Sequence, residues 1–285
     1  MPPPKQPTFG QSIRRIGIKE PVFRDLYHHL ITVSWRRFII GNVLIYLAVN
    51  AVFAGLYLLQ PGSIIGAHKG SVADAFFFSV QTIATIGYGV MAPATVYANL
   101  LVLAETVVGL SLLALVTGVL FARASRPTAR VLFSDVVTIA PWHGRPTLTI
   151  RMGNERRSQI LEADVAVHLL RSEQSPEGVT MRRFHTLALE RSHTPVFALS
   201  YTALHPITPG SPLDGATAES LQEEGMELLV TVTGTEESTG QTVNARQLYR
   251  ASDILFDRRY RDIFVKDATG DTVLDYRHFN ETVPI

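Results

Sequence analysis

The five residues Thr85 to Gly89, which read TIGYG, are the part of the sequence whose types and spacing could do chemistry. Two glycines alternate with larger residues, and glycine allows backbone dihedrals that other residues avoid, so successive carbonyl groups can point at one axis. Loops of this kind replace the water shell of a cation with backbone oxygens. The Thr85 hydroxyl would add a further oxygen. Five residues alone also fit an ordinary turn, so the flanking elements must distinguish the two interpretations.

The segment before this string favours the cation site. Val72 to Ile83 is an apolar run of 12 residues, too short to cross a hydrocarbon core of about 30 Å, and it predicts a re-entrant or interfacial helix. Such a helix would aim its partly negative C-terminal end at the string, where it would stabilise a cation. Backbone that is not helical is tolerated at membrane depth only where it lines protein or water.

Two longer apolar segments bracket this region. Phe38 to Leu59 contains no charged residue, and Asn99 to Ala122 contains only Glu105. At about 1.5 Å per residue, each is long enough to cross the membrane as a helix. A cleaved signal peptide fits the first segment badly because 37 residues precede it. We therefore expect two retained spans.

The distribution of charge predicts the orientation of these spans. Arg36 and Arg37 precede the first, and Arg123, Arg126 and Arg130 follow the second, so the positive-inside rule makes both outer ends cytoplasmic. The whole chain has 26 basic and 25 acidic residues and no cysteine. This balance excludes a strongly basic nucleic-acid binder, and the missing cysteines exclude a disulfide scaffold.

The sequence changes character after Arg130. Short alternating or β-branched runs, such as Thr147 to Met152 and Glu227 to Thr233, are separated by clusters of turn residues. This pattern predicts a β-sandwich. No glycine-rich turn of the nucleotide-binding type is present. We expect three regions: an N-terminal tail with an interfacial helix (1–37), a transmembrane pore domain (38–126) and a β-sandwich (127–285).

Four motifs carry a resemblance to a known family. They are DLYHHLITVSWRRF (25–38), FFFSVQTIATIGYG (76–89), ARASRP (122–127) and GNERRSQILEADV (153–165). The sequence resembles the inwardly rectifying potassium channels, most closely their bacterial members, over nearly its whole length.

The resemblance implies a fold class and a function. The fold would be a membrane α + β protein with an interfacial slide helix, an outer helix (38–59), a pore helix (72–83), a selectivity filter (85–89), an inner helix (99–122) and a cytoplasmic immunoglobulin-like β-sandwich. Two spans cannot enclose a pore, so the channel would be a homotetramer. It would conduct K⁺ across the bacterial inner membrane, with both termini cytoplasmic and no organic cofactor. The K⁺ ions would be held by Thr85, Ile86, Gly87 and Tyr88.

The resemblance also implies roles for single residues around the filter. Gln81 and Met91 stand where eukaryotic relatives carry a glutamate and an arginine that brace the filter, so that ion pair is absent. Glu105 is expected to form hydrogen bonds behind the pore helix, with direct ion contact as the alternative. Leu113 stands where strong rectifiers carry an aspartate, and it predicts weak rectification.

Three residues are candidates for the gate. Phe121 matches the position where the inner helices cross, and four phenylalanines could close the pore by dewetting. The alternative is an interfacial aromatic anchor. Gly118 could bend the inner helix or permit close helix packing. Gly234, in the segment GTEEST (234–239), corresponds to a loop that forms a second constriction.

Two further sets of residues match family positions. The lipid-binding candidates, for anionic lipids that include phosphoinositides, are Trp35, Arg36, Arg123, Arg126, Arg156 and Arg157. General attraction to an anionic surface is the alternative for them. Candidates for the wall of the cytoplasmic pore, where polyamines or Mg²⁺ could bind, are Glu162, Glu190 and Glu237. Each could equally be a solvated acid.

Two rival functions remain open from the sequence. The chain could be a membrane-anchored β-sandwich interaction module, or a cation pore with poor selectivity. No nucleophile and base pair with a recognisable motif is present, and so we expect neither an enzyme nor a nucleic-acid partner.

Overall fold

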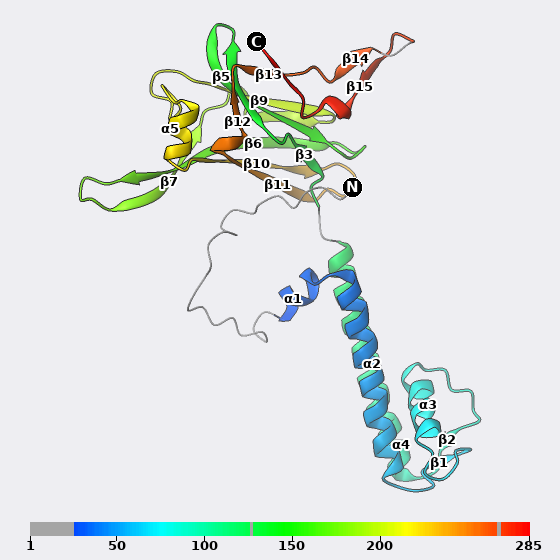
Figure 1. The fold of residues 1–285 in the computed structure, drawn as a ribbon. Coiled ribbons are helices and arrows are strands. Elements are labelled where there is room, and N and C mark those ends of the chain that lie inside the picture. The colour runs from blue at the N-terminus through cyan, green and yellow to red at the C-terminus, as the bar shows by residue number, and fades with distance from the viewer. Residues whose placement is uncertain (1–25, 126–127, 267–268) are drawn as a thin grey trace. The chain divides into compact units, whose positions relative to one another are not determined.

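The computed structural model describes residues 26–125, 128–266 and 269–285, and the chain divides near residues 126–127 into two compact units (Figure 1). Each unit is described by itself. Arg126, one of the lipid-binding candidates, lies outside the described residues.

The first unit is built from four helices. They are α1 (Leu26–Thr32), α2 (Trp35–Leu58), α3 (Val72–Ile83) and α4 (Val96–Ala124). Figure 1 shows α2 and α4 side by side, with the short α3 beside the end of α2 and the start of α4. At about 1.5 Å per residue, α2 and α4 are about 36 and about 44 Å long, which is enough to cross a hydrocarbon core. A two-stranded ribbon of β1 (Ile64–Ile65) and β2 (Ala92–Pro93) closes the segment between them.

Local side chains explain where α3 and α4 begin. Ser71 precedes α3, and its Oγ accepts a hydrogen bond from the backbone N–H of Asp74 at 3.2 Å. Thr95 does the same for α4, with a bond of 3.1 Å from the Ala98 N–H. Both are standard N-cap residues, which satisfy N–H groups that have no partner inside the helix. The local sequence, through the capping residue Ser71, therefore determines where α3 begins.

The helices of the first unit share a small core but leave most of their apolar surface uncovered. The core contains Phe53, Ala54, Tyr57, Ile64, Ala75, Phe78 and Ala98. Of the 29 residues of α4, only Ala98, Glu105, Gly109 and Arg123 are buried. A single chain in water would expose far more contiguous apolar surface than soluble monomers do. The remaining faces of α2 and α4 therefore require lipid or further copies of the chain.

The second unit is a sandwich of two five-stranded sheets. In the first, β6 (Ile160–Gln174) pairs with β10 (Glu227–Glu236), β7 (Thr180–Leu187) and β8 (His193–Phe197), and β11 (Thr242–Arg250) lies beside β10. In the second, β5 (Arg145–Asn154) pairs with β3 (Val131–Phe133), β4 (Val137–Trp142) and β9 (Ser200–Pro206), and β12 (Ile254–Phe256) pairs with β4. The pairing is antiparallel except for β4 with β12.

Alternation along the strands places one face of each sheet in a common core. Leu148, Ile150 and Met152 of β5 are buried, as are Val165, Val167 and Leu169 of β6. Successive side chains of a strand point to opposite faces, so this spacing of two is the signature of a sheet covered on one side. The sandwich predicted from the short alternating runs is confirmed.

Shorter elements complete the second unit. They are α5 (Ala218–Glu223), β13 (Arg258–Tyr260) paired with β16 (Thr282–Pro284), β14 (Phe264–Lys266) paired with β15 (Thr272–Leu274), and two 3₁₀ turns at Ala251–Asp253 and Tyr276–His278. The C-terminal segment is fixed by the buried Arg151 of β5, which donates hydrogen bonds to the carbonyls of Phe279 (3.3 Å) and Arg261 (2.7 Å). The guanidinium also lies 4.5 Å from the centre of the Tyr260 ring, a cation–π distance.

Candidate functional site

The TIGYG segment begins directly on the C-terminal turn of α3. The backbone N–H of Ile86 donates to the Gln81 carbonyl at 2.8 Å, and that of Gly87 reaches the same oxygen at 3.4 Å. The Thr85 N–H donates to the Thr82 carbonyl at 3.1 Å. The segment therefore satisfies carbonyls that the end of the helix would otherwise leave without partners. Gln81 supports the segment through its backbone oxygen.

Backbone dihedrals alternate along the segment. The φ angles of Thr85, Gly87 and Gly89 are +55°, +54° and +80°, and no positive φ occurs at the residues between them. Alternation between the two hands of the backbone turns successive peptide groups to the same side, instead of to opposite sides as in a strand. Two of the three positive positions are glycine, the residue that adopts this conformation without steric cost. The geometry fits a row of carbonyl oxygens facing one axis.

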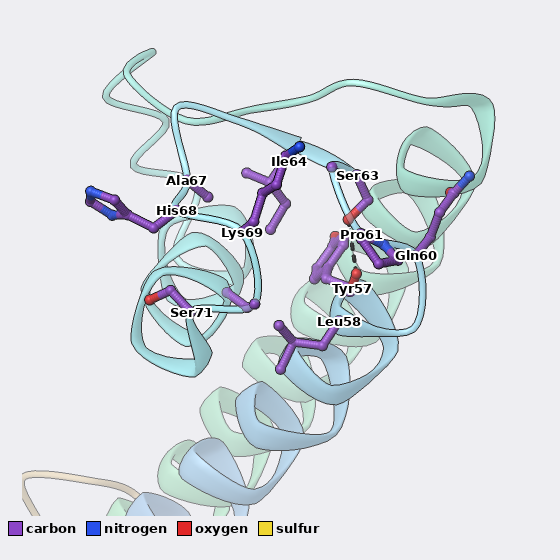
Figure 2. A pocket seen from close by; sticks show the side chains of 13 residues that line it. Tyr57, Leu58, Gln60, Pro61, Ser63, Ile64, Ala67, His68, Lys69 and Ser71 are labelled. Carbon is purple, nitrogen blue, oxygen red and sulfur yellow. Dashed lines mark hydrogen bonds between the residues drawn. The ribbon is translucent and has the colours of Figure 1, made fainter.

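The outer loop next to this segment is tightly packed. Figure 2 shows a pocket beneath it, whose walls include Tyr57, Ser63, Ser71 and Lys69. Its volume of about 50 Å³ has room for water but not for a larger ligand. The Ser63 hydroxyl donates to the Tyr57 carbonyl at 2.8 Å and ties the loop to the end of α2 (Figure 2). His68 points away from this pocket, and its Nδ1 lies 2.8 Å from a carboxylate oxygen of Asp74 on α3.

Behind α3 lies a buried polar cluster centred on Glu105 of α4. One carboxylate oxygen accepts a hydrogen bond of 2.6 Å from the Tyr57 hydroxyl of α2, and the other accepts one from the Ser79 hydroxyl of α3. The Ser79 hydroxyl also lies 3.0 Å from Oδ1 of Asn50, whose Nδ2 donates to the Tyr46 carbonyl at 2.7 Å. One carboxylate thus joins α2, α3 and α4.

Gly109 of α4 packs closely against the end of α3, one of the two roles that the sequence leaves open for it. A Cβ atom at this position would lie 3.1 Å from the Ile83 Cγ2 and 3.4 Å from the Ile83 carbonyl oxygen. Glycine therefore allows α4 to approach the end of α3 where the filter begins. Leu113 follows one turn later on α4, and its side chain is 64% exposed in the single chain. Leu113 and Thr85 both line a mainly apolar cavity of about 460 Å³.

Arg123 occupies a different environment from the one expected of a lipid-binding residue. Only 9% of it is exposed, and its guanidinium donates to the carbonyls of Leu30 (2.5 Å) and Val33 (2.6 Å) at the end of α1. The same group lies 4.7 Å from the ring centres of both Trp35 and Phe38. Nη1 and Nη2 of Arg123 therefore hold α1 against α4, whereas its Nε has no partner among the described residues. Lipid binding at Arg123 stays a prediction.

The other lipid-binding candidates, Phe121 and Gly118 are more exposed than Arg123 in the part of the chain that the structure describes. Phe121, two residues before Arg123, is 74% exposed, and nothing lies within 4 Å of a Cβ placed on Gly118. Arg36 is exposed at the start of α2. In the second unit, Arg157 is exposed, while Nη2 of Arg156 donates to the Thr128 hydroxyl at 2.8 Å.

The resemblance placed Gly234 in a loop, but the structure places it in a strand; its role in the gate stays a prediction. The residue lies inside β10, opposite an irregularity in β6, and not at the tip of a loop. A Cβ atom there would lie 2.6 Å from the Ile160 Cγ2 and 3.0 Å from the Leu161 carbonyl oxygen, so close packing requires glycine. The turn itself follows β10 and returns at Thr242.

A buried acid next to this turn was missed by the sequence analysis. Glu236 accepts hydrogen bonds from the hydroxyls of Ser238 (2.7 and 2.8 Å) and Thr239 (2.7 Å) and from the Thr239 N–H (2.9 Å). Hydrogen bonds, first from Ser158 and then from Ser238 and Thr239, lower the pKa of the Glu236 carboxyl to about 2. Serine and threonine two and three residues after a glutamate were the available signal.

The three glutamates that are candidates for the cytoplasmic pore wall differ in their hydrogen bonds and in their backbone conformation. The Glu237 carboxylate accepts a hydrogen bond of 3.0 Å from the Gln159 N–H, so it fixes the turn that carries Arg156 and Arg157 instead of standing free. Glu190 is exposed between β7 and β8. Glu162 is exposed and has a φ of +47°, which is rare outside glycine.

Comparison with known proteins decides the family. Residues 39–126 match the model of the ion channel family, and residues 131–285 match that of the inward rectifier potassium channel C-terminal domain. The chain is 44% identical to the inward rectifier potassium channel Kirbac3.1 of Paramagnetospirillum magnetotacticum, over 98% of this chain and 97% of that protein. The chain belongs to the inward rectifier potassium channel family.

Eukaryotic members of the family are more distant. The chain is 28% identical to the bovine ATP-sensitive inward rectifier potassium channel 12 and to the human inward rectifier potassium channel 18, over 92% of its own length. It spans about two thirds of the length of these two relatives, 66% and 65%. Channels of this family are tetramers, so the predicted fold class is confirmed. The chain is an integral membrane protein with two spanning helices, and an ion channel rather than an enzyme.

The cluster around Glu105 leads to a first prediction. Glu105→Leu leaves the buried hydroxyls of Tyr57 and Ser79 without their acceptor, and each unpaired buried group costs about 1–3 kcal/mol. We expect the thermal unfolding temperature of the purified channel to fall by several degrees. Thr106→Val is the matched control, because Thr106 bonds only to the Val102 carbonyl of its own helix. Equal stability of Glu105→Leu and the control would contradict the bracing role.

Proposed function

We propose that four copies of the chain form a potassium-selective pore in the bacterial inner membrane, with Thr85 to Gly89 as the filter and both termini in the cytoplasm. The observation that carries this proposal is the alternation of positive φ at Thr85, Gly87 and Gly89, directly at the end of a half-length helix. The uncovered apolar faces of α2 and α4 support the assembly, because fourfold packing and lipid would bury them.

The filter would hold K⁺ by its backbone oxygens. The carbonyls of Thr85, Ile86, Gly87 and Tyr88 would replace the water shell of the ion, and the C-terminal end of α3 would add a favourable partial negative charge. Glu105 would act from behind through Ser79, without contact with the ion. A poorly selective pore or a membrane-anchored interaction module would use the same helices without needing this alternation.

Selectivity is tested by Gly87→Ala. The φ of +54° costs an L-residue on the order of 1 kcal/mol, in each of four subunits, so the carbonyl row should be disturbed. We expect potassium-selective flux into liposomes to be lost, measured as K⁺ against Na⁺ uptake. Gly70→Ala is the matched control, since Gly70 has a φ of +75° and open space around its Cβ but lies in the outer loop. Wild-type selectivity in Gly87→Ala would show that this segment is not the selectivity filter.

Weak rectification follows from the apolar residue below the filter. Leu113 shares a cavity with Thr85, so Leu113→Asp would place four carboxylates around the conduction path. We expect this variant to gain voltage-dependent block by internal spermine or Mg²⁺. Leu113→Asn is the control, because it is polar and of similar size but uncharged. Block that is the same in both variants would mean that Leu113 does not face the path.

Gating would couple the interfacial helix to the inner helix. Arg123 holds the carbonyl end of α1 and stands two residues after Phe121, the candidate constriction. Anionic lipids near Trp35 and Arg36, and near Arg156 and Arg157 on the second unit, would bias this arrangement. An element with two states whose populations the lipid shifts is what such regulation requires.

Arg123→Gln and Arg36→Gln separate this coupling from general attraction to lipid. Each variant removes one positive charge from the arginines at the ends of the two spans. Only Arg123→Gln also weakens the two carbonyl contacts and the stacking on Trp35 and Phe38. We expect Arg123→Gln to change K⁺ flux in vesicles of neutral lipid, where Arg36→Gln behaves as wild type. If the two variants show identical K⁺ flux in neutral and in anionic vesicles, the coupling through Arg123 is wrong, and general attraction to anionic lipid explains the role of both arginines.

A further inference from the structure

An apolar groove of about 480 Å³ lies between the end of α2 and the start of α3. None of the side chains that line it is polar, and its walls include Ala51, Gly55 and Leu58 of α2 and Val72, Phe76 and Phe77 of α3. Nothing lies within 4 Å of a Cβ atom placed on Gly55, so the small residues of α2 leave the groove open. The atoms that line an open groove lack the contacts of close packing until an occupant fills it.

The position of the groove along α2 sets its depth in the membrane. Gly55 follows Arg36 by 19 residues on the same helix, which corresponds to about 28 Å along the helix axis. This is close to the thickness of the hydrocarbon core, about 30 Å. The groove therefore lies at the opposite side of the membrane from the basic residues that precede the first span.

One cation stands beside the groove. Lys69 is the only lysine or arginine between residues 38 and 122, and it precedes Ser71, which caps α3. Its side chain lines the small pocket of Figure 2 together with Leu58, and Leu58 also lines the groove. A lysine packs its stem along apolar surface and keeps its ammonium group at the polar boundary. The groove thus has an apolar body and a positive charge next to its end.

Lys69 has no acidic partner among the residues that the structure describes. Asp74 is the only acid between residues 38 and 104. Its Oδ2 lies 2.8 Å from the backbone nitrogen of His68 and 2.8 Å from Nδ1 of the same residue, so it is turned towards His68. The ammonium group of Lys69 is therefore available to an anion that is not part of this unit.

Charge complementarity identifies the occupant. From its own residues 38–122, a second copy of the chain could offer Lys69 only Asp74 or Glu105. Asp74 is engaged by His68, and Glu105 is completely buried. A phospholipid with a net negative headgroup supplies both missing parts, because its acyl chain fits an apolar groove and its phosphate complements the lysine.

We propose that the groove binds an acyl chain of an anionic phospholipid whose headgroup pairs with Lys69. With both termini in the cytoplasm, as proposed above, this lipid belongs to the outer leaflet, and the site is separate from the candidates at Trp35 and Arg36. The acyl chain packs against the start of α3, the helix that carries TIGYG at its other end. The inference goes beyond the proposed function, since the lipid can bind there whichever segment forms the filter.

Photocrosslinking on the purified full-length channel tests this site. The channel is reconstituted in vesicles that contain phosphatidylglycerol or phosphatidylcholine with a diazirine in the acyl chain, and the labelled peptides are located by mass spectrometry. One positive charge near an anionic headgroup corresponds to about fivefold in binding, so we expect phosphatidylglycerol to label residues 51–58 and 72–77 about fivefold more than phosphatidylcholine does. Equal labelling by the two lipids would overturn the proposal.

Two variants separate the charge from the groove. Lys69→Gln should reduce the preference for phosphatidylglycerol to about one, while phosphatidylcholine labels as in wild type. Gly55→Leu should fill the groove and abolish labelling there by both lipids. Gly41→Leu is the matched control, because Gly41 lies on the same helix and also has nothing within 4 Å of its Cβ position. It should keep the wild-type labelling of the groove.

The remaining outcomes are equally decisive. An unchanged preference in Lys69→Gln, which alters only an exposed side chain, would overturn the role of the lysine. A groove that neither lipid labels in wild type would mean that a second copy of the chain covers it. K⁺ against Na⁺ flux in the same vesicles separates this inference from the proposed function: selective flux with equal labelling leaves the channel and removes the lipid site, and the reverse result removes the filter alone.

Discussion

The burial of one carboxylate among three helices is the constraint on which the first unit depends. In a hydrocarbon environment Glu105 requires partners, and it finds them in Tyr57 of α2 and Ser79 of α3. The same bonds fix the rotation of α4 and the depth of α3, and the depth of α3 sets the level at which Thr85 begins. Gly109 makes this possible, because a larger residue would push α4 away from Ile83. The TIGYG segment thus follows a helix that is held in place from behind by hydrogen bonds.

At the C-terminal end of the same helix, a cation plays the corresponding role. The Arg123 guanidinium donates to two carbonyls of α1 and lies over two aromatic rings, so its charge is compensated without a carboxylate. Arginine suits this position because its planar donors can address two acceptors while its faces remain free for stacking. The inner helix is therefore anchored near both ends by buried polar groups, and between them Gly118 and Leu113 have no such contacts.

Much of the architecture could be predicted because it rests on local or periodic signals. The half-length helix was visible from 12 apolar residues followed by a loop of alternating glycines, and the sandwich from alternation with a period of two. Roles that depend on packing were not visible. Arg123 looks like Arg36 as a basic residue at the end of a span, and its contacts with α1 separate the two. Gly234 was expected in a loop because of the resemblance, yet it lies inside β10, opposite the bulge in β6.

The bulge and the neighbouring turn also explain why acids close together in sequence behave differently. Glu236 points inward and is held by hydroxyl and N–H donors, so its ionised form contributes stability above the ordinary carboxyl pKa, a contribution lost as the pH falls towards about 2. Glu237 fixes the turn that carries Arg156 and Arg157. The Glu162 side chain is 71% exposed, and its carboxylate lies 3.1 Å from Nε2 of His193. Glu236 and Glu237 therefore build the turn, whereas Glu162 presents its carboxylate to solvent.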